Sequence, residues 1–229
     1  MTLKLSEVKP FFGSHLDKPL VKYFYYYVAI FFSWIYINLG LSAHIVNLLG
    51  LLASLSAAGI IFFTGGKWMI LAGILIMFAY VSDLCDGTVA RAYNKKNAMG
   101  KWLDESAGFI GISLVFFAFM MRTLISTQDL WIIVLGFFAI FGYLMMNMAA
   151  ILSEIIRTRF KLDNPAEKIR KKAGGFLRIN PGLFAFSFDI QWTFVAICVM
   201  FNAPYILFLV FGTLSNLQWM ARYFIFFGK

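Results

Sequence analysis

Six long apolar runs constrain the fold of this chain more than any other feature of its sequence. They cover residues 43–65, 68–90, 100–124, 130–155, 182–201 and 204–226. A helix that crosses the roughly 30 Å hydrocarbon core of a bilayer needs about 20 largely apolar residues, and each run reaches that length. The chain is 61% hydrophobic and only 14% charged, whereas a soluble domain carries about 25% charged residues. The runs therefore predict an all-α integral membrane protein with six transmembrane helices.

A seventh apolar run, Tyr23–Leu41, is long enough to span but is unusually rich in tyrosine. Tyrosine and tryptophan prefer the headgroup region of a bilayer, so this run is expected to form an amphipathic helix in the interface plane. Residues 1–42 are thus predicted to be a cytoplasmic, interfacial segment, followed by one six-helix membrane domain over residues 43–229. A seventh span remains the alternative.

The distribution of basic residues favours six spans with the N-terminus in the cytoplasm. In that topology, Lys67 and Arg122 are the only Lys and Arg residues placed outside. A crossing by Tyr23–Leu41 would also move four lysines outside, against the positive-inside bias. These are Lys4, Lys9, Lys18 and Lys22.

Carboxylates lie where the second run ends and the third begins. Asp83 and Asp86 are three residues apart and share one helix face, while Asp104 and Glu105 follow a short loop. Charges at this depth are expensive in hydrocarbon and usually mark a functional site. Carboxylates that converge without matching cations repel one another unless they bind a metal, and oxygen-only ligation favours Mg²⁺, Mn²⁺ or Ca²⁺.

The spacing from Asp83 to Asp104, DxxDGxxARx₈GxxxD, resembles the signature of the CDP-alcohol phosphotransferase family. In length and span number the resemblance covers roughly residues 43–227. It implies a membrane enzyme of phospholipid or related lipid synthesis that moves a substituted phosphate from a CDP-linked lipid donor to an alcohol and releases CMP. It also implies that Asp83, Asp86 and Asp104 bind Mg²⁺ or Mn²⁺ and that Asp104 is one of the catalytic residues. The implied nucleotide pocket contains Asp83, Asp86, Gly87, Ala90, Arg91 and Gly100.

The sequence departs from the family pattern at Gly108. The signature ends in a further aspartate, which serves as general base and metal ligand, and glycine can do neither. Glu105, about 60° away around the helix axis, is predicted to replace the base. A substrate group or another residue is an alternative, as is an inactive member that binds CDP-lipid or nucleotide, or regulates a partner. A cation transporter would not explain Gly87, Ala90 and Arg91.

Three further predictions concern substrates and partners. The first run begins SAHIVN where family members often have PNxxT, so Asn47 is a candidate nucleotide contact or, equally, part of a helix start. Arg157 and Arg159 are candidates for contact with an acceptor phosphate, while the rest of the basic loop is expected to attract anionic lipid. The expected partners are the CDP-lipid, a small alcohol or phosphorylated alcohol as acceptor, the bilayer and a second copy of the chain. Nucleic acid is not expected.

Overall fold

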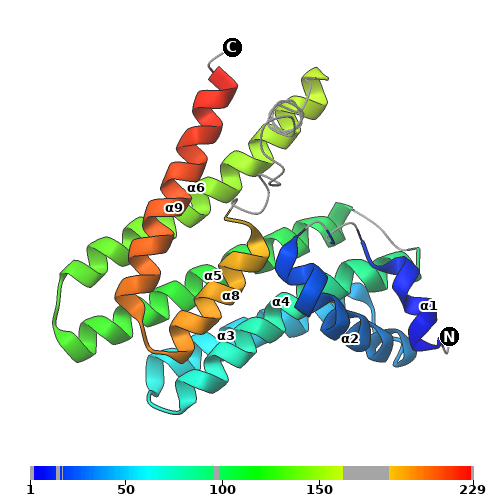
Figure 1. Cartoon of the computed structure of the whole chain (residues 1–229), viewed down its shortest axis with the longest axis horizontal. Helices are drawn as coiled ribbons and strands as arrows, with labels where there is room; N and C mark the ends of the chain where they lie inside the picture. The colour runs from blue at the N-terminus through cyan, green and yellow to red at the C-terminus, as the bar shows by residue number, and fades with distance from the viewer. Residues whose placement is uncertain (1–2, 14–15, 17, 95–97, 162–185, 228–229) are drawn as a thin grey trace.

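The computed structural model describes residues 3–13, 16, 18–94, 98–161 and 186–227, and every element in those ranges is helical. Figure 1 shows the course of the chain. The N-terminal elements are α1 (Leu5–Val8), the 3-10 turn η1 (Lys9–Phe11), the π-helical η3 (Val21–Tyr25) and α2 (Tyr26–Asn38). The remaining helices are α3 (Ala43–Phe63), α4 (Trp68–Ala92), α5 (Ala98–Thr127), α6 (Trp131–Phe160), α8 (Phe188–Met200) and α9 (Pro204–Phe227).

Helices occupy all six predicted runs, although they differ in their capacity to cross a membrane. Four are long and apolar enough to do so: α3, α4, the Ser106–Thr127 part of α5, and α6. The apolar helix α8 has 13 described residues, and residues 182–185 of the fifth run lie outside the described part of the chain. The 24-residue α9 is not among these four in the described part of the chain, and it carries Asn216 and Gln218 near its middle. The all-helical membrane fold is thus confirmed, while the count of six spans stays a prediction.

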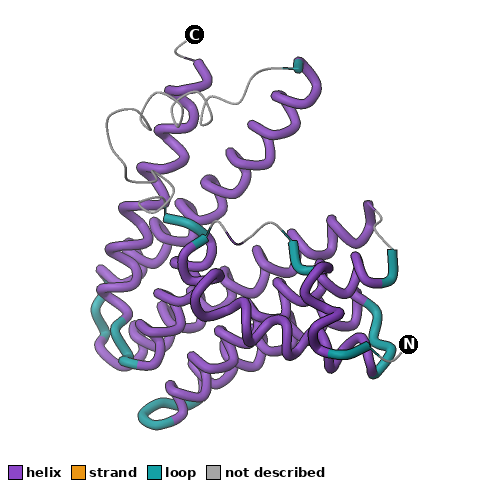
Figure 2. The backbone as a smooth tube through the Cα atoms, turned by 45° about the vertical axis from the view of Figure 1, so that its right-hand side comes forward, coloured by secondary structure: helices purple, strands orange, loops and turns teal. Residues whose placement is uncertain are grey.

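Helices α3, α4 and α5 form the part of the fold that carries the predicted site. α3 packs along both α4 and α5, and α8 covers α4. A second unit is the pair of α6 and α9, which lie side by side. Their C-terminal ends extend together beyond the other helices, as Figures 1 and 2 both show.

The N-terminal segment packs against α4 through α2. Ala29, Ile30 and Ile37 of α2 are buried, whereas Tyr27 and Phe31 are exposed. The outward face of α2 is therefore aromatic rather than charged, so the amphipathic character predicted for this helix is not confirmed. Exposed aromatic rings are nonetheless suited to the headgroup region.

Candidate functional site

A close contact between α3 and α4 sets the geometry of the site. A Cβ added to Gly50 would lie 3.0 Å from the Cβ of Ser82, so the two helices touch at this point. Because these consecutive helices are antiparallel, one turn back along α3 and one turn forward along α4 brings Asn47 beside Asp86. The Nδ2 of Asn47 donates to Oδ2 of Asp86 at 3.0 Å. Asp86 is only 7% exposed, and a buried carboxylate needs such a donor.

A second close contact brings α5 against α3 one helical turn beyond Gly50. A Cβ on Gly111 would lie 2.8 Å from Oγ of Ser54. Two helical turns before Ser54 is Asn47, and two turns before Gly111 is Asp104. Because α3 and α5 are parallel, the backbone of Asp104 is level with Asn47, and therefore with Asp86. The side chains of Asp104 and Glu105 lie outside the described residues.

These contacts enclose a pocket between the helices. Its walls come from α3, α4, α5 and α8: Asn47, Gly50, Leu51, Ser54, Ala79, Asp83, Ala107, Gly108 and Trp192. Asp83 is the acidic residue of this lining, and its side chain is exposed, in contrast to the buried Asp86. The two motif aspartates thus differ in environment: Asp86 is fixed by Asn47 within the helix packing, and Asp83 opens onto the pocket.

Gly108 lines the same pocket at the position of the missing family aspartate. A Cβ built there meets nothing within 4 Å. Its backbone carbonyl accepts a hydrogen bond from the Tyr143 hydroxyl at 3.3 Å. The space that a side chain would occupy at position 108 is open, so glycine is not required there by packing.

Arg91 lies one turn beyond Gly87 on α4. A Cβ on Gly87 would lie 3.2 Å from a terminal nitrogen of the Arg91 guanidinium, so glycine lets the side chain lie back along its own helix. The Nε of Arg91 donates to the backbone carbonyl of Phe11 at 2.5 Å. This contact could not be predicted from the sequence, because the two residues are far apart in the chain.

The donor set fits a hard divalent cation in its chemistry. Asp83 and Asp86 supply carboxylate oxygens from one face of α4, and the register places Asp104 of α5 at the same level. Among the described residues, no group of three His, Cys, Asp or Glu side chains could hold an ion. The third carboxylate of the predicted set is outside that search, so metal binding stays a prediction.

The other predicted residues lie at different distances from this pocket. Ala90 and Gly100 are partly exposed, Ala90 in the last turns of α4 and Gly100 in the first turn of α5. Arg157 and Arg159 are in the last turn of α6, which extends beyond the α3–α5 unit (Figure 1). No described contact links these two arginines to the pocket.

An all-helical membrane protein with carboxylates at adjoining helix ends is the class that this fold and site define. The family model of CDP-alcohol phosphatidyltransferase matches residues 41–204, more than half of the chain, and the chain belongs to this family. The family identifies it as a membrane transferase of phospholipid synthesis. No curated protein matches the chain.

Several residues in or beside the pocket were not predicted from the sequence. Gly50 and Ser54 form a small-xxx-small pair on the first apolar run, which is a recognisable signal for close helix contact. Trp192 and Tyr143 reach the site through tertiary packing alone, and nothing in their local sequence distinguishes them from other buried aromatic residues.

Proposed function

We propose that the chain transfers a substituted phosphate from a CDP-linked lipid to an alcohol acceptor. The acceptor oxygen forms a bond to the phosphorus nearer the lipid, the bond from that phosphorus to the CMP oxygen breaks, and CMP leaves with the electron pair. The hydroxyl proton passes to a base on the protein. The observation that carries the proposal is the pairing of Asn47 with buried Asp86 beside a pocket that Asp83 and Gly108 line.

The motif carboxylates act on the donor in this proposal. Asp83, Asp86 and Asp104 would hold Mg²⁺ or Mn²⁺. The bound ion would neutralise negative charge on the diphosphate of the donor. Asn47 orients the Asp86 carboxylate, since its amide fixes one of the two oxygens. Gly87 leaves room for the Arg91 guanidinium, which contributes positive charge to the nucleotide pocket, and Ala90 and Gly100 are proposed to line the same pocket.

Glu105 is the proposed base. It precedes Gly108 by three residues, nearly one helical turn, and its side chain is one methylene longer than that of aspartate. A positioned base contributes about 10²–10⁴-fold to a proton-transfer step. The alternative, a member that binds CDP-lipid without turnover, is favoured by the open space at Gly108, where the family base is absent.

Assays of CMP release separate these two functions. Purified protein is given a CDP-linked lipid and Mg²⁺ with glycerol phosphate, inositol phosphate, serine or inositol as acceptor, and the product is identified by mass spectrometry. A transferase releases CMP in the presence of one acceptor. Nucleotide binding without release with any of the acceptors would favour the inactive binding protein.

The proposed topology has six spans, with the N-terminus and the site on the cytoplasmic face. A single cysteine introduced at Lys4 or Lys67, both exposed, tests it with an impermeant maleimide. Six spans predict labelling at position 67 from outside and at position 4 only from the cytoplasmic side. Labelling at position 4 from outside would indicate the seven-span alternative. The native Cys85 and Cys198 are buried, and their replacement by alanine removes background.

Two further assignments complete the proposal. Arg157 and Arg159 are proposed to bind an acidic acceptor, because the last turn of α6 presents both of them. Charge reversal of both arginines should raise the KM for a phosphorylated acceptor and leave CDP-lipid affinity unchanged.

A homodimer is the proposed assembly, and crosslinking in native membranes measures it directly.

A further inference from the structure

The guanidinium of Arg91 is held between two glycines that belong to distant parts of the chain. On one side is Gly87 of its own helix, and on the other is Gly13, whose added Cβ would lie 3.0 Å from a terminal nitrogen of Arg91. The Nε of Arg91 donates to the Phe11 carbonyl at 2.5 Å, and a terminal nitrogen lies 3.4 Å from Oγ1 of Thr88. The side chain is therefore fixed in direction before any ligand binds.

The segment that provides Phe11 and Gly13 is itself anchored to α2. We name residues Leu3–Gly13 the N-terminal strap. Its first described residue, Leu3, donates from its backbone to Oδ1 of Asn38 at 2.8 Å, and its carbonyl accepts from Nε1 of Trp34 at 2.7 Å. Near the other end, the ring of Phe12 packs edge-on against Tyr26 at 5.0 Å. The strap thus runs from α2 to the motif arginine on α4.

We propose that the N-terminal strap is a positioning element for the nucleotide site, acting through Arg91. This inference rests on the proposed function, in which Arg91 lies beside the CDP group. The Phe11 carbonyl accepts the Nε hydrogen and Thr88 Oγ1 accepts one hydrogen from a terminal nitrogen, so at most three of the four terminal hydrogens are left for a ligand. An arginine that is already ordered loses less conformational freedom when it binds a phosphate, and the strap supplies that order.

Gly13→Leu tests the proposal with little effect on the fold. The atoms nearest to Gly13 are the far end of a flexible arginine side chain, so a larger residue displaces the guanidinium rather than the backbone. We expect about a tenfold loss of CDP affinity, measured directly on the purified full-length protein in detergent with Mg²⁺. The melting temperature should not change. Gly59→Leu is the matched control, because a Cβ there meets open space, and it should retain wild-type affinity.

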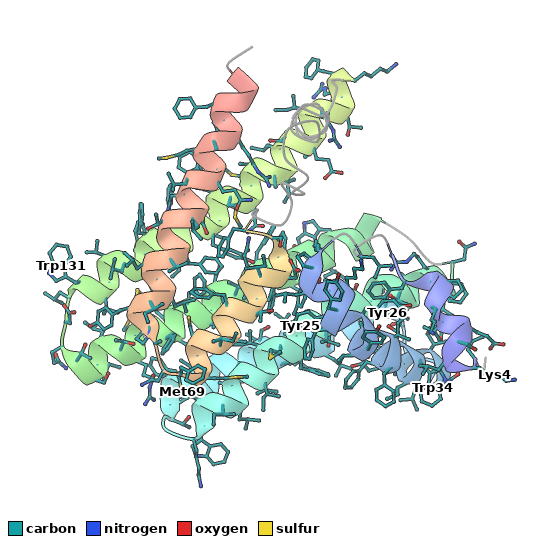
Figure 3. All side chains as sticks on the ribbon, viewed as in Figure 1. Lys4, Tyr25, Tyr26, Trp34, Met69 and Trp131 are labelled. Atoms are coloured by element: carbon teal, nitrogen blue, oxygen red, sulfur yellow. The ribbon has the colours of Figure 1, made fainter. Side chains whose placement is uncertain are left out.

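Release of the strap at its far end provides an independent test. Trp34→Phe combined with Asn38→Ala removes the side-chain bonds to Leu3 without touching Arg91. CDP affinity should fall in the wild-type background and should not fall further in Arg91→Ala, since both changes act through one side chain. Trp131→Phe is the control for tryptophan replacement, because Trp131 is 72% exposed and lies at the opposite end of the molecule (Figure 3).

The outcomes distinguish this inference from the proposed function. If Arg91→Ala weakens CDP binding while Gly13→Leu does not, the strap has no positioning role and the transferase proposal stands. An additive loss when the strap is released in Arg91→Ala would show that it acts by another route and would overturn the inference. Wild-type CDP affinity in Arg91→Ala would overturn both the inference and the place of Arg91 in the nucleotide pocket.

Discussion

Gly108→Asp is the most informative substitution in this chain, because it restores the family carboxylate in a position that has room for it. A Cβ at Gly108 meets nothing within 4 Å, and the residue lines the pocket together with Asp83. We predict that this substitution rescues a variant from which the proposed base has been removed. The background for the test is Glu105→Gln, which keeps the side-chain shape and removes the ability to accept a proton.

The rescue of CMP release by Gly108→Asp is expected to come from proton transfer and not from a change in stability. Aspartate is better than glycine in a helix by roughly 0.3 kcal/mol, so a change in stability accounts for less than about twofold in any measured quantity. Loss of a general base should lower CMP release by about 10²–10⁴-fold. A carboxylate returned to the same pocket, one turn from the original base, should recover at least about tenfold of that loss.

The assay is steady-state CMP release from a CDP-linked lipid by four purified proteins: wild type, Glu105→Gln, and Glu105→Gln combined with either Gly108→Asp or Gly108→Asn. The asparagine variant has the shape of aspartate without its basicity, and it should not rescue. Equal rates for wild type and Glu105→Gln would refute the assignment of Glu105. Absence of rescue by Gly108→Asp, with CDP binding intact, would show that the open space at Gly108 does not belong to the reacting end of the pocket.

Three other predictions concern the framework of the site. Asn47→Ala should leave the buried Asp86 carboxylate without its amide donor, and the Mg²⁺ concentration for half-maximal activity should rise about tenfold, measured by metal titration. Gly50→Leu should separate α3 from α4 at Ser82 and lower the free energy of unfolding by about 1–3 kcal/mol, measured by thermal or denaturant unfolding in detergent. An unchanged midpoint would contradict the close contact. Chelation by EDTA should abolish CMP release and added Mg²⁺ or Mn²⁺ should restore it, whereas release that persists without metal would contradict the role given to the aspartates.

The helices were predictable from the sequence because one signal, a long apolar run, determines both their existence and their approximate ends. The first four runs agree with α3, α4, α5 and α6 to within a few residues. The Tyr23–Leu41 run was less well determined, because aromatic residues suit both a buried face and the headgroup region. Its helix packs on α4 and has an aromatic outer face. The hydrophobic pattern of the sequence alone does not distinguish such a helix from an amphipathic one.

That Asp83 and Asp86 lie on one stretch of α4 was predictable, because residues three apart share a helix face, while their roles stay predictions. The pairing of Asn47 with Asp86 was not, since it depends on where α3 crosses α4, and that point is set by Gly50 and Ser82. The contact between Phe11 and Arg91 joins residues 80 positions apart. Local sequence carries no signal for such a contact, because the hydrogen-bond acceptor is a backbone carbonyl.

CMP release with and without Asp86 measures whether the carboxylates of α4 support transfer from a CDP-linked lipid. Wild-type protein and Asp129→Asn, which changes a carboxylate in the turn before α6, should both release CMP in the presence of Mg²⁺ and an acceptor. Asp86→Ala should release none above the rate without protein. Wild-type rates of CMP release in Asp86→Ala would contradict a role for Asp86 in the transfer.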